Sequence, residues 1–295
     1  MNNLIKCTLP LLITLFACNS SFRVVENTNG AYQPKYQRNG GTKRETIFNR
    51  TKVDNEELKM LLIKSIASQS IVEPNPTNET SKIDHIKNKA SADFNRKLTE
   101  IQREIESLDL NDKNFRKKLL ELDVRKNNLL CQEREGISQL DDKIEVLSGD
   151  LTFNTGSSKI TKRGEQYLDE ICASINSEAE RWKKYVNRCN QQIFENEIMV
   201  IVIDISGYAD RRGDETSNLV LSQERSNEVQ KAIRLKLASL ASASNIKFDL
   251  TEIFSTGYGE KLPPGYADGP ADDPSRRICM INYMVGPKRF LSSTD

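Results

Sequence analysis

The strongest constraint on the fold is one continuous apolar run at residues 197–206, Glu-Ile-Met-Val-Ile-Val-Ile-Asp-Ile-Ser. β-Branched residues dominate this run, and they do not alternate regularly with polar ones. A strand of this kind is typical of the middle of a sheet that is covered on both faces. The rest of the C-terminal half must therefore supply neighbouring strands and the helices that cover them.

The segments around this run alternate between strand and helix patterns. The expected elements are a strand at 151–153, a helix at 161–176, the strand at 197–206, a helix at 221–240, and strands at 248–255 and 277–285. This β-α-β-α-β-β order predicts an α/β (α+β) domain, a mixed sheet with helices packed on it, at residues 148–286. Residues 287–295 are interpreted as a C-terminal tail.

A helical stalk is predicted at residues 80–147, which contain no proline. Its apolar residues recur at spacings of three, four and seven, as the a and d positions of heptad repeats do. They are Phe94, Leu98, Ile101, Ile105, Leu108, Phe115, Leu119, Leu122 and Leu129. The pattern favours a coiled coil, either self-associating as a homo-oligomer or folded back as a hairpin near 111–112. The alternative is one long helix packed on the next domain.

The N-terminus begins with a short basic stretch and an apolar run at residues 7–17. This run is about half the ~20 residues that a membrane-spanning helix needs, so residues 1–17 are interpreted as a signal peptide. It ends in Leu15-Phe16-Ala17-Cys18, which resembles the lipobox of bacterial lipoproteins. The resemblance implies that Cys18 is lipidated.

Asn19 follows Cys18 where an inner-membrane lipoprotein would carry Asp, so the resemblance implies a lipid anchor on the periplasmic face of the cell outer membrane. Residues 18–79 are rich in Asn, Gly, Ser and Thr, and they cannot bury enough apolar area to order this whole segment. They are predicted to be a flexible tether with one short helix at 56–69.

The most specific motif directly follows the apolar run. It reads Gly207-Tyr208-Ala209-Asp210-Arg211-Arg212-Gly213, then Asn218, Leu221, Ser222 and Arg225. It resembles the core of the OmpA/MotB/Pal family of peptidoglycan-binding domains, in which a Gly-[aromatic or His]-x-Asp-x-x-Gly loop precedes Asn-x-x-Leu-Ser-x-x-Arg-Ala. Only Ser226 departs, in place of alanine. Three further motifs resemble the family in the same order: 153–157, 257–260 and 273–278.

The resemblance implies a non-catalytic protein that binds the diaminopimelate of the peptidoglycan stem peptide and tethers the outer membrane to the wall. The binding residues that it implies are Ala209, Asp210, Arg212, Asn218, Leu221, Arg225, Arg276 and Arg277. Asp210 would accept the ligand's ammonium, and the planar fork of Arg225 would hold its carboxylate. Asn218 and the backbone amides after Asp210 would complete the site. A structural ion pair between Asp210 and Arg225 is the alternative.

Two of the six cysteines, Cys172 and Cys189, are candidates for a disulfide. In one continuous helix they would be about 25 Å apart, too far to bridge. A capping-box pattern at residues 177–180 predicts a helix break between them, so either this disulfide or buried free thiols remains possible. The link at 176–196 is longer than the family's usual one and predicts an inserted helix.

Other classes of function have little support. The net charge of +1 provides no electrostatic footprint for nucleic acid. One histidine leaves little from which to build a metal centre or a nucleophile–base pair, so neither an enzyme nor a cofactor is predicted. Two alternatives keep the wall-binding domain: a scaffold subunit of a secretion, adhesion or other envelope complex, and a MotB-like stator. The stator would need a transmembrane helix carrying an acid.

The lipidation hypothesis predicts that Cys18→Ala yields unprocessed or soluble protein, because two acyl chains are needed for stable membrane anchoring. Metabolic labelling with a fatty-acid probe tests this. Equal label on the wild-type and Cys18→Ala proteins would show that Cys18 is not the anchor.

Overall fold

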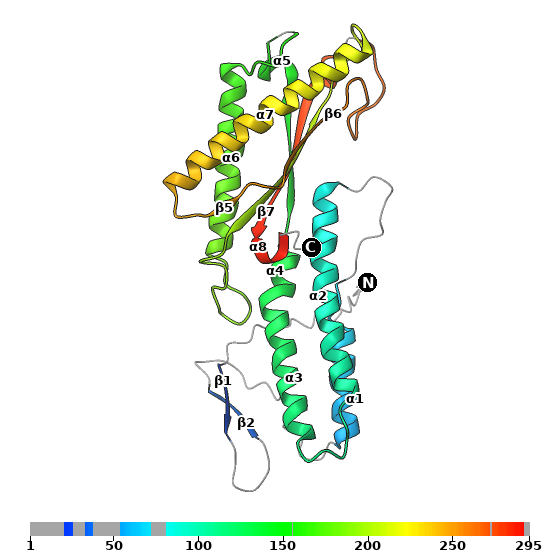
Figure 1. The fold of residues 1–295 in the computed structure, drawn as a ribbon, viewed down its shortest axis with the longest axis vertical. Helices are drawn as coiled ribbons and strands as arrows, with labels where there is room; N and C mark the ends of the chain where they lie inside the picture. The colour runs from blue at the N-terminus through cyan, green and yellow to red at the C-terminus, as the bar shows by residue number, and fades with distance from the viewer. Residues whose placement is uncertain are drawn as a thin grey trace, which may run out of the picture.

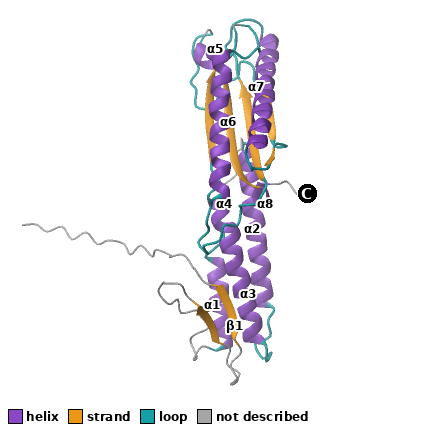
Figure 2. Cartoon of the chain, turned by 90° about the vertical axis from the view of Figure 1, so that its left-hand side faces the viewer, coloured by secondary structure: helices purple, strands orange, loops and turns teal. Residues whose placement is uncertain are grey.

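The computed structural model describes residues 21–25, 33–37, 54–71, 81–154, 156–271 and 273–291. The predicted signal peptide and Cys18 lie outside the described residues. The molecule is elongated, with a helical bundle at one end and a sheet domain at the other (Figures 1 and 2). Within the described segments no helix is both long enough and apolar enough to cross a membrane.

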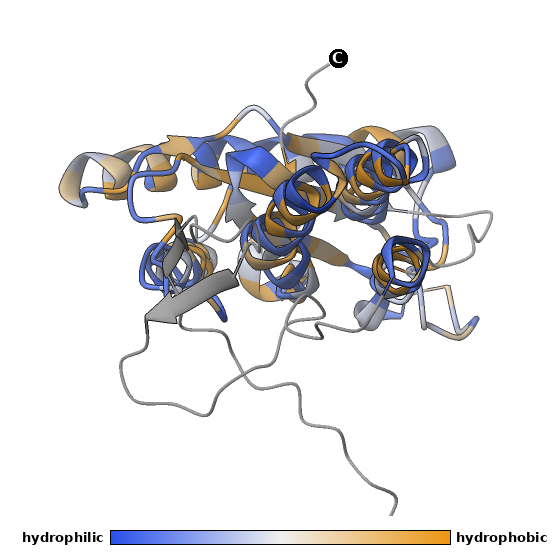
Figure 3. Cartoon of the chain, turned by 90° about the horizontal axis from the view of Figure 1, so that it is seen from below, coloured by the Kyte–Doolittle hydropathy of each residue, from blue (hydrophilic) through white to orange (hydrophobic). Residues whose placement is uncertain are grey.

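Three helices form the bundle: α1 (Asn55–Ala67), α2 (Lys82–Glu106) and α3 (Phe115–Leu129). α2 runs down the bundle and α3 returns beside it, with α1 packed against both (Figure 1). The interior is built from predicted heptad positions, of which Phe94, Leu98, Ile101, Ile105, Phe115 and Leu119 are at most 2% exposed. Seen from below, the bundle helices carry both hydrophobic and hydrophilic residues (Figure 3). Of the three stalk arrangements considered, the single chain adopts the hairpin, and self-association stays a prediction.

The tether contains regular structure that its composition does not predict. β1 (Ser21–Val25) and β2 (Gln33–Gln37) pair antiparallel, from Ser21 opposite Gln37 to Val25 opposite Gln33. The prediction of an irregular chain is wrong for these two segments. β1 contains one phenylalanine and two valines, which favour strands, but the polar average of the whole segment hides them.

The sheet domain follows the predicted order, except that the strand expected at 248–255 is divided into two. β3 (Asp142–Ser148) and β4 (Met199–Gly207) both pair antiparallel with β7 (Ile278–Pro287), and β5 (Phe248–Asp249) and β6 (Ile253–Gly257) pair parallel with the other side of β4. α6 (Lys162–Lys183) packs on β3 and β7, and α7 (Glu215–Ala243) packs on β4 and β6. The predicted fold class is confirmed, with the apolar run as the buried middle strand.

The first strand is not where the sequence pattern placed it. The expected strand at 151–153 is instead the end of the helical turn α5 (Gly149–Thr152), followed by an isolated bridge between Phe153 and Ile160. β3 lies earlier, inside the predicted stalk. Its Ile144 and Leu147 fit the heptad spacing, but the segment 142–148 pairs over its full length with β7, and this pairing decides its structure.

The predicted helix break at 177–180 is also absent, because α6 continues to Lys183. The residues from 184 to 198 then form an irregular loop rather than an inserted helix. One reason why α6 continues to Lys183 is Trp182, which is fully buried and donates a hydrogen bond of 2.8 Å to the Val285 carbonyl. Burying this indole anchors the last turn of α6 against β7.

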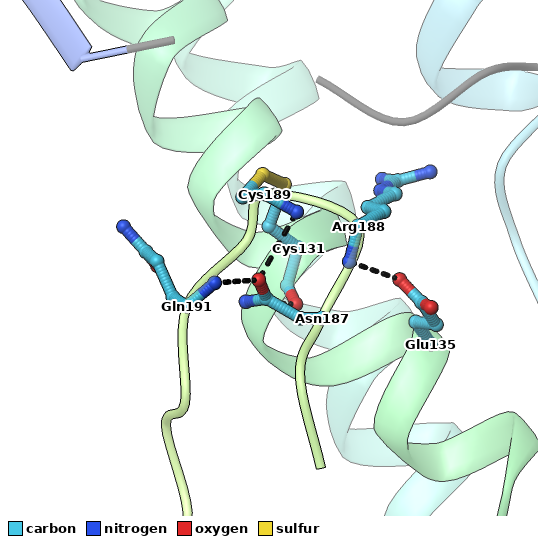
Figure 4. Close-up of a disulfide and its surroundings, with 6 residues drawn as sticks. All are labelled: Cys131, Glu135, Asn187, Arg188, Cys189 and Gln191. Atoms are coloured by element: carbon cyan, nitrogen blue, oxygen red, sulfur yellow. Dashed lines mark hydrogen bonds between the residues drawn. A yellow bond between two sulfur atoms is a disulfide. The ribbon is translucent and has the colours of Figure 1, made fainter. Parts of the chain in front are cut away.

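Cys189 forms its disulfide with Cys131, not with Cys172, so the pairing considered from the sequence is wrong (Figure 4). The continuous α6 keeps Cys172 away from the loop, and both Cys172 and Cys279 are buried free thiols. Cys131 lies in a π-helical turn, Leu130–Arg134, that follows α3. The side chain of Asn187 orders the loop: its amide donates to the Cys131 carbonyl at 3.0 Å, and its oxygen accepts from the Cys189 amide at 3.0 Å.

An aromatic cluster joins the bundle to the sheet domain in the same region as the disulfide. Trp182 and Phe290 each contact Phe194 edge-on, with ring centroids 5.4 and 5.5 Å apart. Phe290 belongs to α8 (Lys288–Leu291), and it lies against Gly136 of α4 (Glu135–Ser138). A Cβ atom on Gly136 would be 2.6 Å from the Phe290 ring, so glycine is needed for this close packing. The bundle and the domain are therefore one packed unit.

Cys131→Ser should lower the free energy of unfolding by about 2–4 kcal/mol, because it frees a loop that the disulfide closes in the unfolded chain. Urea titration measures this, and added reductant should destabilise the wild-type protein but not the variant. Peptide mapping without reductant should find residues 131 and 189 linked. A peptide linking Cys172 to Cys189 would contradict the structure.

Candidate functional site

The motif residues gather at the carboxyl end of β4, where open α/β sheets commonly bind ligands. The loop at 207–214 leads from β4 into α7, whose first turn is capped by the side chain of Asp214. α7 packs directly on the end of the strand, since a Cβ atom on Gly207 would lie 2.3 Å from the Ser222 carbonyl oxygen. Gly213 turns the loop with a φ of 97°, which favours glycine.

Asp210 is buried, at 5% exposure, and two arginines hold its carboxylate. Its Oδ2 atom accepts from Arg212 Nε at 2.8 Å and from Arg277 Nη1 at 3.1 Å. Arg277 also binds Asp150, at 2.6 Å, while the Arg212 side chain is 56% exposed. Of the two cations on Asp210, Arg277 is therefore also fixed by the Asp150 carboxylate, and Arg212 lies at the surface.

Arg225 is also buried, at 6% exposure, but it does not pair with Asp210. Its Nε donates to the Ser157 carbonyl at 3.0 Å, and its guanidinium carbon lies 5.0 Å from the centre of the Phe153 ring. No carboxylate of the described residues comes within 4.0 Å of its nitrogens. Burial accordingly lowers the pKa of Arg225. The structural ion pair considered as the alternative is absent. Asp150 and Asp210 act on Arg225 only from a distance, so Arg225 is a buried cation that no described carboxylate contacts.

Asn218 holds the loop rather than standing free for a ligand. Its Nδ2 atom lies 3.1 Å from the Asp210 carbonyl, 2.9 Å from the Arg212 carbonyl and 2.8 Å from Glu260 Oε1. The backbone amides expected to grip the ligand are also occupied: Arg211 donates to the Ala271 carbonyl, and Arg212 donates to Asp210 Oδ1. Asn218 and these amides position Asp210.

The two arginines before the last strand have different surroundings. Arg277 reaches Asp210, whereas Arg276 is fully buried behind the loop and donates to the Glu260 carbonyl. Its Nε and Nη1 atoms have no hydrogen-bond partner among the described residues, and Asp268 lies 3.8 Å away. Of the two, only Arg277 contacts Asp210.

Of the remaining predicted residues, Ala209 is buried, with its amide bonded to the Gly259 carbonyl, and Leu221 is half-buried on α7. The sequence analysis missed two residues that shape the site, Asp150 and Glu260. Glu260 lies inside a motif that resembles the family, so it could have been found. Asp150 had no such signal, because its role depends on the turn α5 bringing it to Arg277.

No protein-family model and no curated protein matches the chain. Among solved structures, the OmpA-like domain of FopA1 from Francisella tularensis subsp. tularensis SCHU S4 is 14% identical, with a TM-score of 0.32, and the match covers 50% of this chain and 75% of that one. The peptidoglycan-associated lipoprotein from Burkholderia pseudomallei is 17% identical, with a TM-score of 0.30 and coverages of 45% and 87%. The cell wall anchor of the T6SS from Pseudomonas aeruginosa is 14% identical, with a TM-score of 0.31 and coverages of 49% and 87%. These likenesses are too low to carry an argument about this chain.

Asn218→Ala should lower the free energy of unfolding by about 1–3 kcal/mol, because it leaves buried carbonyl oxygens without their donor. Thermal or urea unfolding measures the change. Leu219→Ala is the matched control, since this neighbour is 49% exposed and its loss should cost less than about 0.5 kcal/mol. Equal stability of both variants would contradict the role given to Asn218.

Proposed function

We propose that the sheet domain binds peptidoglycan, without catalysis, by holding the zwitterionic end of diaminopimelate between Asp210 and Arg225. The observation that carries this proposal is the buried Arg225 guanidinium without a carboxylate partner. An unpaired buried cation is costly to the folded protein. A ligand carboxylate that reaches it would form a charge-assisted bidentate pair, the geometry for which arginine is suited.

The ammonium of the ligand would bind Asp210 by exchange. In the free protein Arg212 and Arg277 neutralise this carboxylate. Arg277 is held in place by Asp150, whereas the Arg212 side chain is 56% exposed and can turn into solvent when another cation takes its place on the buried carboxylate. The incoming ammonium would then replace the Arg212 guanidinium, and the net charge at Asp210 would not change.

The proposal extends to the whole chain as an outer-membrane lipoprotein that tethers the membrane to the wall. The candidate site lies at the end of the sheet domain that is farther from the bundle, whereas β1 and β2 lie beside the lower part of the bundle (Figure 1). In the chain order, the bundle helices lie between Cys18 and the loops proposed to bind the wall. The bundle would act as a spacer between the two attachments.

Asp210→Ala and Arg225→Ala should each weaken binding about ten- to a hundredfold, because each removes one charged contact of about 1.5–3 kcal/mol. Arg225→Lys should not restore binding, since a single ammonium cannot reproduce the planar fork. Affinity for purified sacculi and for free diaminopimelate, measured beside the melting temperature, tests this.

Lys231→Ala is the matched control, because it removes a cation that is 67% exposed on the same helix. It should bind as the wild-type protein does. Folded Asp210→Ala and Arg225→Ala proteins that retain full affinity for sacculi would overturn the site. Arg212→Ala should leave binding intact or slightly stronger, as expected of a residue that the ligand displaces.

A further inference from the structure

The sheet face turned away from α6 and α7 is only partly covered. Odd-numbered residues of β4 and β6 face α7, as the tight contacts of Gly207 and Gly257 with α7 show. The even-numbered residues therefore face the other way. The bundle covers the lower part of this face: Leu140 packs on Gly286, and the Lys82 ammonium lies 3.9 Å from the centre of the Phe254 ring.

Beyond the end of α2 this face is open and rich in apolar side chains. Strand register places Ile144, Asn282, Asp204 and Phe254 in one row across four strands, with Val146 and Met280 in the next row. Ile144 is 57% exposed and Val146 is 47% exposed, and the other four are half-buried. We call these six residues the open face.

The centre of the open face holds two acceptors without donors. Asp204 has no hydrogen bond and no ion pair to any described residue, and burial raises its pKa. Beside it in register, the Asn282 Oδ1 atom is buried without a hydrogen-bond partner in the described part of the chain. Among the described residues of the bundle, Lys82 is the cation that acts on Asp204, and its ammonium lies over the Phe254 ring.

We propose that the open face docks a partner protein through an amphipathic helix that inserts one arginine or lysine at Asp204 and Asn282. A charged contact enclosed by apolar side chains is the arrangement of a binding hot spot. The outer strands of the row are about 14 Å apart at ~4.8 Å per strand. A helix laid across them would contact the face with about two and a half turns, through residues at i, i+3 or i+4, and i+7.

The occupant is a different protein rather than a second copy of this chain. Two open faces related by a two-fold axis would bring one Asp204 against the other, and like charges in a buried interface are repulsive. An incoming cation would instead pair with the Asp204 carboxylate. The partner helix, lying across the strands, would extend the covering layer beyond the end of α2 at Lys82. This surface is separate from the loops proposed to bind peptidoglycan.

The test uses the full chain and two synthetic peptides. Both are amphipathic helices of about 16 residues with leucines at the anchor positions, and they differ at one central position, which is arginine or the neutral isostere citrulline. Calorimetry should show at least tenfold tighter binding of the arginine peptide to the wild-type protein. Asp204→Asn should remove this preference, whereas Glu145→Gln, on an exposed β3 carboxylate outside the open face, should keep it.

Ile144→Arg provides a second variant, since this exposed position tolerates substitution and the new charge should repel the arginine peptide. Sacculus binding by all three variants should equal that of the wild-type protein, which separates this proposal from the proposed function. Equal affinity for the two peptides, no binding of either, or an arginine preference that survives Asp204→Asn would overturn the proposal. Dimerisation abolished by Ile144→Arg would overturn it in favour of a second copy.

Discussion

A strand that is apolar on both faces needs two covering layers, and the rest of this structure depends on how the chain supplies them. α6 and α7 form one layer over the sheet, in which α7 covers β4 and α6 covers β3 and β7. The second layer is the end of the helical bundle, where α2 contacts β4 and β7 and Leu140 packs on Gly286. The bundle is therefore part of the domain's core rather than an independent stalk. The helical hairpin packs against the sheet as well as within the bundle. For this reason heptad positions and sheet residues belong to one hydrophobic cluster.

The candidate site depends on the same strand. β4 ends where α7 packs closest, and this contact sets both the loop that carries Asp210 and the helix that carries Arg225. The two charges come from consecutive elements, yet they do not neutralise each other. Asp210 is held by arginines from its own loop and from the start of β7, and Arg225 lies against Phe153 and the Ser157 carbonyl. This separation is what the proposed function requires, since it assigns opposite ends of one ligand to Asp210 and Arg225.

Much of the fold and of the site was predictable because it is encoded locally. The apolar run that became β4, the long helix after it and the motif residues of the loop are each specified by neighbouring residues. The errors arose where distant segments decide the outcome. β3 satisfies a helical spacing, but β7 offers it a pairing partner. Cys189 could have paired with any free thiol in reach, and the chain's path brings it to Cys131. Which arginine meets Asp210 depends on where β7 begins, so Arg277 could not be assigned over Arg276 without coordinates.

The link between Cys131 and Cys189 also determines how the molecule responds to being pulled. These cysteines are 58 residues apart in sequence, and the chain between them contains β3 and α6. Fully extended, such a segment would add roughly 200 Å of length at ~3.4 Å per residue. The disulfide prevents this segment from extending. Tension along the chain therefore passes through the Cys131–Cys189 bond, from the end of α3 to the loop before β4. If the protein were stretched between two attachments, β3 and α6 would thus lie outside the path of the force. The chain would also lengthen by a much shorter distance before the sheet is strained.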